Sequence, residues 1–416
     1  QRRERFTLLC HQAATTPQNQ PELGELKNLH WAGCFLPVEV DAAKASHLYK
    51  TSKGKVIRSD NGIIIRIMEL LGSAWPMSLS FEQLVFNCQS PESKEDIHET
   101  VWESLKSLFM SAPEGLYWSA SPSAYNSAQN EQLRFVGALP SACPAENTPV
   151  LNLWGESVTL TPAEWNFLHA EMNVASRTAW EHYSTLKMKG LLIGSSAAWK
   201  NQLQLFLRAG MTDVLKSQIP FLLLLSVNHQ RGGLLQDDVH EPALADYNVD
   251  SVYQRVNEFI RKGQTQKARE YAQGLIEIDP DNIHILRCYS RACVLTSSWD
   301  DALAALCKLM GYYFTSLDIY YDLATVLQKK REFYCARNII RTLTRLNPKN
   351  IDYWLSLASL HHAYGDMTLA EKCCREIMRF QHPGANSLGL TGIILSDNHK
   401  MAEARYFMEK AVEMSN

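Results

Sequence analysis

Small and apolar residues recur with a fixed period in the last part of the chain. Alanines stand at Ala268, Ala302, Ala336, Ala370 and Ala404, so the interval from each to the next is constant. Each alanine follows a short polar turn and precedes apolar residues at helical spacing. The pattern predicts five units of about 34 residues, each a pair of amphipathic helices.

Turn residues mark the borders of these units. The proline-containing segments Asp279 to Asn282 and Asn347 to Asn350 are separated by twice the period. Gly263 and Gly365 fall where the two helices of a unit meet, and we expect them to form the bend. Because one helix pair cannot bury both of its faces, stacked pairs share a core and curve into a superhelix with a concave groove.

The period, the small residues and the proline between units resemble the tetratricopeptide repeat. Trp354 fits the aromatic position of that family, and Gly392 fits the small position of the final unit. The pattern departs from the family at Phe314, where proline is usual, and at Pro383, which comes one position late. The resemblance covers about residues 250–416. It implies a right-handed α-solenoid whose groove holds an extended peptide or a helix.

By that family's geometry, the groove is lined by positions 2, 5, 9 and 12 of the first helix of each unit. The predicted peptide-binding residues are Tyr253, Asn257, Arg287, Arg291, Tyr321, Thr325, Leu355 and Ser359. Arg287 and Arg291 lie one helical turn apart, so they share a helix face and can receive a carboxylate bidentately. The alternative is a solvated face whose arginines pair within their own helix. The family's carboxylate-clamp subtype is not matched, because Tyr253 stands where that subtype has lysine.

The front half shows no period. Apolar spacing predicts helices over residues 63–71, 80–86 and 98–110 and then a strand at 116–118, an order that suggests a winged helix. A second unit of this kind follows, with strands at 150–153 and 158–160. Residues 161–164 then combine a threonine cap, a proline and a reciprocal glutamate, which is a helix start. Further helices are predicted over residues 163–172, 179–189, 199–208 and 214–227.

We therefore expect a mainly α fold in three parts. Residues 1–125 form a winged-helix-like α+β unit, residues 126–245 form a second winged-helix-like or helical domain, and residues 246–416 form the repeats.

Three segments of the front half carry short motifs. Residues 5–11 include R-F-T-L-L-C-H, residues 62–86 include Trp75-Pro76, and residues 151–160 include Trp154. They are similar to the regulatory region of a group of bacterial methyltransferases that depend on S-adenosylmethionine, although Trp154 stands where that group often has arginine. In the group's protein-lysine methyltransferases, a Rossmann-type catalytic domain precedes this region, and winged-helix or tetratricopeptide modules follow it. The resemblance implies a catalytic domain upstream in the same polypeptide or in a partner chain.

The chain itself shows no motif for this chemistry. It has no G-x-G-x-G, no G-x-G-x-x-G and no phosphate-binding loop. His361 and His362 are adjacent, so a regular helix turns their rings about 100° apart, away from a shared ion. We expect no catalytic, cofactor or metal site in these residues; S-adenosylmethionine would bind the presumed catalytic domain.

The charge balance and the apolar stretches argue against a nucleic-acid-binding protein and against a membrane-spanning one. The chain has 41 Lys and Arg against 44 Asp and Glu, and the helix over residues 98–110 sets Lys106 against Glu99 and Glu103. Nucleic-acid binding is therefore disfavoured. The longest apolar stretch, residues 219–227, is far shorter than the roughly 20 residues that cross a membrane. Ten scattered cysteines without a C-x-x-C pair, and the lack of an export signal, favour the cytoplasm.

The sequence thus predicts the non-catalytic regulatory part of a bacterial protein methyltransferase, which recognises a protein or peptide substrate in its repeat groove. Lysine would be the residue that is methylated. Because the chain opens on Gln1, we expect it to be the back part of a longer polypeptide. The alternative is a free-standing repeat scaffold or adaptor for protein interactions. A third possibility is a winged-helix protein that binds nucleic acid weakly.

Overall fold

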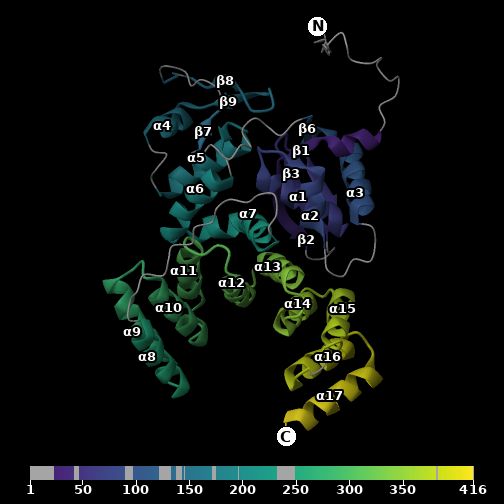
Figure 1. Cartoon of the computed structure of the whole chain (residues 1–416), viewed down its shortest axis with the longest axis vertical. Coiled ribbons are helices and arrows are strands. Elements are labelled where there is room, and N and C mark those ends of the chain that lie inside the picture. The colour runs from purple at the N-terminus through teal and green to yellow at the C-terminus, as the bar shows by residue number, and fades with distance from the viewer. Residues whose placement is uncertain are drawn as a thin grey trace.

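The computed structural model describes residues 23–41, 46–89, 97–120, 133–136, 143–144, 146–170, 175–194, 196–231, 249–380 and 383–415. Within these residues the chain is mainly helical, as predicted, and its strands lie ahead of residue 194. Figure 1 shows a compact N-terminal half seated on an arch of helix pairs. The motif at residues 5–11 lies outside the described residues.

The first part of the chain folds three helices against two small sheets. The predicted helices are present, and β1 lies between β5 and β6, antiparallel to both. The order β2-β3-β4 makes the second sheet. The elements are β1 (His30–Gly33), β2 (Phe35–Asp41), β3 (Ser46–Thr51), β4 (Val56–Ser59), α1 (Gly62–Ala74), β5 (Leu79–Ser80), α2 (Phe81–Cys88), α3 (Ile97–Ser111) and β6 (Leu116–Ser119), with short 3-10 helices at Leu23–Asn28 and Pro113–Gly115.

Local capping starts helices α1 and α2. The side-chain oxygen of Asn61 accepts hydrogen bonds from the backbone N–H groups of Ile63 and Ile64 and so begins α1. Ser80 and Gln83 form a capping box at the start of α2. The apolar faces of α1, α2 and α3 then meet in one core with β1.

The second part contains short strand pairs and four helices. β8 pairs with β9, and β7 pairs with β10. The predicted helix start at Thr161 is confirmed, because Thr161 and Glu164 exchange backbone-to-side-chain hydrogen bonds of 2.8 and 3.2 Å. The winged-helix description of both parts stays a prediction. The elements are β7 (Arg134–Phe135), β8 (Thr148–Leu151), β9 (Ser157–Leu160), α4 (Pro162–Ala170), α5 (Arg177–Met188), β10 (Leu192–Ile193), α6 (Ser196–Arg208) and α7 (Thr212–Arg231).

The repeat region is a stack of five helix pairs, as the period predicts. The five alanines that define the period are at most 2% exposed, because each lies where neighbouring helices approach closely. The first helices are α8 (Val249–Arg261), α10 (Ile283–Leu295), α12 (Leu317–Lys329), α14 (Ile351–Ala363) and α16 (Ala385–Asp397). The second helices are α9 (Thr265–Ile278), α11 (Trp299–Met310), α13 (Phe333–Leu346), α15 (Met367–Ile377) and α17 (Met401–Ser415).

The bend inside each unit has the same backbone conformation. It places a residue with positive φ at Gly263, Ser297, Arg331, Gly365 and His399, so the bends follow the same period as the alanines. Side chains with a Cβ rarely adopt this left-handed conformation. Glycine marks two of the five bends, and the other three form without it.

The N-terminal half packs on the second helices of the central repeats. Helices α6 and α7 contact α11, and α7 also contacts α13 and α1. The Arg208 Nε donates to the carbonyl of Gly311 at 3.0 Å, and Lys216 pairs with Glu332 at 2.7 Å. The arch opens on the opposite side, where α10, α12 and α14 lie (Figure 1). The groove of the repeats is therefore left uncovered by the described N-terminal half.

The predicted domain limits stay predictions, and the border near residue 245 lies outside the described residues. Across that border, buried side chains of α6 and α7 form one continuous core with those of α11 to α14.

Candidate functional site

A cavity of about 280 Å³ lies on the inner face of the first three repeats. It is bounded by α8, α10 and α12, the first helices of their units, and by Leu306 of α11. Its polar lining comes from Tyr253, Asn257, Arg287, Arg291, Ser290 and Asp322, and its apolar lining comes from Val256, Cys288, Val294 and Leu306. The structure thus brings four of the predicted groove residues together around one hollow.

The two arginines of this cavity reach across the groove to the neighbouring helices. Arg291 Nη1 donates to the Asn257 side-chain oxygen on α8 at 3.3 Å. Arg287 Nη2 lies 3.6 Å from Asp318 Oδ2 on α12, and both side chains are largely open to solvent. Among the described residues, these partners lie on α8 and α12 and not on α10, so the arginines are not paired within their own helix. Most of their N–H groups stay available to a ligand.

The walls of the groove change the ionisation of the groups between the arginines. Loss of hydration raises the pKa of Asp322, and the nearby Asp318 adds to the effect, while Arg287 and Arg291 oppose it. Burial also raises the pKa of the Cys288 thiol to about 11, against the pull of the same arginines. The thiol is therefore protonated at neutral pH and is no nucleophile.

The other predicted groove residues form a separate row along α12 and α14. The Tyr321 hydroxyl lies 3.2 Å from the Ser356 hydroxyl, and Thr325 donates to the Tyr321 carbonyl at 3.0 Å. Ser359 accepts a hydrogen bond from Gln328 at 3.2 Å. Leu355 is half-buried against the core. These four side chains do not line the cavity, and the hydrogen bonds of Tyr321 and Ser359 join α12 to α14.

Asp322 was missed by the sequence analysis. It occupies the same repeat position as Cys288, one period earlier, and that position directly follows the groove position held by Arg287 and Tyr321. A charged residue at a position that is buried cysteine in the preceding unit was the available signal.

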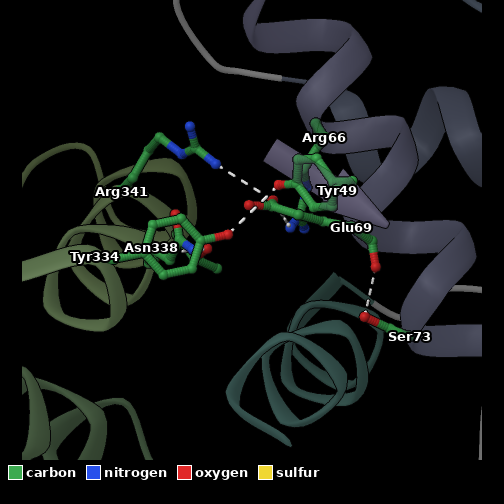
Figure 2. A network of polar contacts seen from close by, with 8 residues as sticks. Tyr49, Arg66, Glu69, Ser73, Tyr334, Asn338 and Arg341 are labelled. Carbon is green, nitrogen blue, oxygen red and sulfur yellow. Dashed lines mark hydrogen bonds and ion pairs between the residues drawn. The ribbon is translucent and has the colours of Figure 1, made fainter. Parts of the chain in front are cut away.

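A buried polar network joins the N-terminal half to the third repeat (Figure 2). One oxygen of the Glu69 carboxylate, on α1, accepts from Arg66 at 3.4 Å and from Arg341, on α13, at 3.3 Å. The hydroxyls of Tyr49 and Tyr334 meet at 3.4 Å beside it. Glu69 is 6% exposed, so this network fixes how the two halves sit together.

No metal or membrane site is found in the described part of the chain. No three His, Cys, Asp or Glu side chains there come close enough to hold an ion. Likewise, no helix among those residues has both the length and the apolar character needed to cross a membrane.

Comparison with known proteins identifies the first helix pair. Residues 249–282, which contain α8 and α9, match the family model described as tetratricopeptide repeat. No curated protein matches the chain.

Three solved structures are similar to parts of this chain, and two of them are described as tetratricopeptide repeat proteins. MamA from Desulfovibrio magneticus RS-1 is 12% identical, with 42% of this chain and 97% of that chain covered and a TM-score of 0.36. YrrB, described as a TPR protein with an unusual peptide-binding site, is 16% identical over 40% and 86% of the two chains, with a TM-score of 0.32. A tetratricopeptide repeat protein from Parabacteroides merdae ATCC 43184 is 15% identical over 61% and 91%, with a TM-score of 0.37.

Proposed function

We propose that this chain is a protein-interaction scaffold whose repeat groove binds an extended peptide with an acidic side chain. The observation that carries this proposal is the cavity between α8, α10 and α12, where Arg291 is paired with the neutral amide of Asn257. Asn257 supplies no charge, and the nearby acid is Asp322, whose pKa is raised by burial in the same cavity. A carboxylate that reaches Arg291 gains charge-assisted hydrogen bonds.

The far end of the groove supports an apolar contact for the same peptide. Ile393, on α16, follows Ser359 by one period and is 47% exposed. It continues the row that starts at Asn257 and Arg291. An occupant with an acidic residue near α10 and an apolar residue near α16 therefore matches the groove in only one direction.

A peptide-binding measurement tests this proposal. We expect fluorescent peptides that carry glutamate to bind more tightly than the same peptides with glutamine, by roughly tenfold for one charge-assisted bond. Arg291→Gln should remove that preference. Arg255→Gln, which changes an exposed arginine on the neighbouring α8, should retain it. Equal affinity of the glutamate and glutamine peptides for the wild-type chain would contradict the proposal.

A second candidate is the regulatory part of a bacterial, cytoplasmic protein methyltransferase that acts on lysine. It is supported by contact between the two motif-bearing segments that the structure describes. The Trp75 and Trp154 rings stack with centroids 6.4 Å apart, and the Trp154 Nε1 donates to the Pro76 carbonyl at 3.1 Å. On this proposal, S-adenosylmethionine binds a catalytic domain outside these residues.

A methyl-transfer assay separates the two candidates. The second predicts that radiolabelled methyl donor modifies a captured protein only when the chain is extended at its N-terminus or supplied with the catalytic partner. Methyl transfer by this chain alone would contradict it. If no extension or partner gene encodes a methyltransferase domain, the scaffold function stands by itself.

A further inference from the structure

A second cavity, of about 90 Å³, lies where the N-terminal half meets the repeats. Its walls come from parts of the chain that are far apart in sequence: Phe35 of β2, Ser73 of α1, Lys187 of α5, Phe221 of α7 and Tyr334 of α13. A smaller cavity beside it is also lined by Lys187 and Phe221. Lys187 therefore stands at the point where both hollows meet.

Lys187 is a cation held between aromatic rings. Its Nζ lies 4.6 Å from the ring centroid of Trp199 and 5.1 Å from that of Phe221. It donates a long hydrogen bond, of 3.4 Å, to the carbonyl oxygen of Ser73. Among the residues that the structure describes, no carboxylate forms an ion pair with it. The two aromatic faces attract the ammonium, but they do not neutralise its charge.

The acidic side chain that lines this cavity is paired with other residues. Glu69 lines the same cavity, yet its carboxylate is held by Arg66 and Arg341 (Figure 2). Lys187 is partly buried, and an ammonium that loses part of its hydration without a counter-ion is unfavourable, because it gains no opposite charge in return. Burial accordingly lowers the pKa of Lys187 to about 8. The described residues therefore supply no anion to pair with the Lys187 ammonium.

We propose that this junction cavity binds a small organic carboxylate, with the carboxylate on the Lys187 ammonium and a short apolar tail among Phe35, Trp75 and Phe221. The space limits the size of the ligand. A cavity of about 150 Å³ holds a benzene molecule, so this one takes a chain of only a few carbons. The ammonium requires an anionic head, and the aromatic walls favour an aliphatic tail over a polar one.

Such a ligand would contact both halves of the molecule at once. Its tail would lie against β2 and α7, and the cavity wall at Tyr334 belongs to the third repeat. Since a ligand that binds only the folded state stabilises it by mass action, occupancy of this site strengthens the junction.

Butyrate is a suitable probe, with butyramide as its uncharged analogue. We expect butyrate to raise the thermal midpoint of the full chain at pH 7 relative to chloride at equal ionic strength, whereas butyramide should not. The rise should continue with the logarithm of the butyrate concentration above the dissociation constant.

Lys187→Met tests the role of the ammonium, because methionine keeps an unbranched apolar side chain and removes the charge. Loss of a charge-assisted bond should weaken butyrate binding roughly 10- to 100-fold. Lys106→Met, on the surface of α3, should leave binding unchanged.

Three results would overturn the proposal: no response of the wild-type chain to butyrate, an equal response to butyramide, or an equal response in Lys187→Met. If Lys187→Met fails to fold, saturation-transfer NMR of butyrate against butyramide on the wild-type chain gives the same decision. Contact with butyrate alone would support the site, and contact with both or neither would reject it.

Discussion

The second helices at the centre of the repeats differ from those at the ends in what covers them. Helix α9 buries only Ala268 and Ala272, and α17 buries only Ala404, whereas α11 and α13 are buried along most of their length. All four occupy the same place in their repeat unit. Helices α6 and α7 cover the central pair, whereas α9 and α17 belong to the end repeats, which have a neighbouring repeat on one side only.

Equivalent positions show how the sequence adapts to this cover. Gln273 and Glu277 are exposed on α9. The residues one period later are Cys307, which is fully buried, and Gly311, which touches α6. The outer face of a repeat thus changes from polar to small where another part of the chain docks. Within a repeat sequence, outer positions that are no longer polar therefore indicate where another part of the chain packs.

The largest expected effect separates a covered carboxylate from an uncovered one. Glu69→Gln leaves Arg66 and Arg341 without their shared negative charge, and breaking a buried pair in this way costs about 3–5 kcal/mol. Glu258→Gln on α8 removes an exposed partner of Lys262 and should have little measurable effect. Urea denaturation measures both. Similar changes in the two variants would show that the junction network contributes no more than a surface pair.

Substitution of two glycines, one beside a covered helix and one in an uncovered helix, should change stability by smaller amounts. A Cβ at Gly311 would lie 2.9 Å from the Arg208 backbone nitrogen, so Gly311→Ala must push α6 away from α11, at a cost of about 1–3 kcal/mol. Gly274, inside the uncovered α9, has open space around it, and Gly274→Ala should stabilise by about 0.5–1 kcal/mol. Thermal unfolding of the two variants should shift in opposite directions. A stabilising Gly311→Ala would mean that α6 does not rest on α11.

A third effect is a dependence of stability on pH that originates beside the covered helix α13. Burial, together with the charges of Arg337 and Arg341 on that helix, lowers the pKa of His361 to about 4, although Asp366 opposes this. The unfolded chain, with a pKa near 6.5, therefore binds more protons between these values. Stability should be full above pH 6.5 and fall as the pH drops, by about 1–2 kcal/mol at pH 5.

His361→Gln identifies the source of that dependence. The variant should show a smaller loss of stability between pH 6.5 and 5 than the wild type. Gly311→Ala, which is destabilised for an unrelated reason, should keep the wild-type dependence. An unchanged slope in His361→Gln would assign the effect to other groups.

The repeat architecture was predictable because it depends on local patterns that recur. Alanine at close approaches, and asparagine caps such as Asn282 and Asn350, occur at fixed phases. The bends at Ser297, Arg331 and His399 could not be read in the same way. Their left-handed backbone is imposed by the stacking of helices on either side, which overrides local preference.

The junction could not be predicted from the sequence, because it depends on partners far apart. Glu69 and Arg341 are 272 residues apart, and no motif position in the sequence singles out either residue. Lys187 reads as an ordinary basic residue near the end of a helix, and only the fold places it between Trp199 and Phe221. For the predicted groove residues, the period was enough to locate the helix face. Only the structure shows that Asp322 lines the cavity and that Tyr321 belongs to a separate row.

The docking of α6 and α7 on α11 and α13 also determines how the arch deforms. Each unit of such an array contacts only its neighbours, so the array can bend elastically along its length. Here the packing of α6 and α7 restrains the second and third repeats. When the groove closes on a narrow occupant or widens for a bulky one, we expect the repeats at the two ends to move. The second and third repeats should keep their relative orientation.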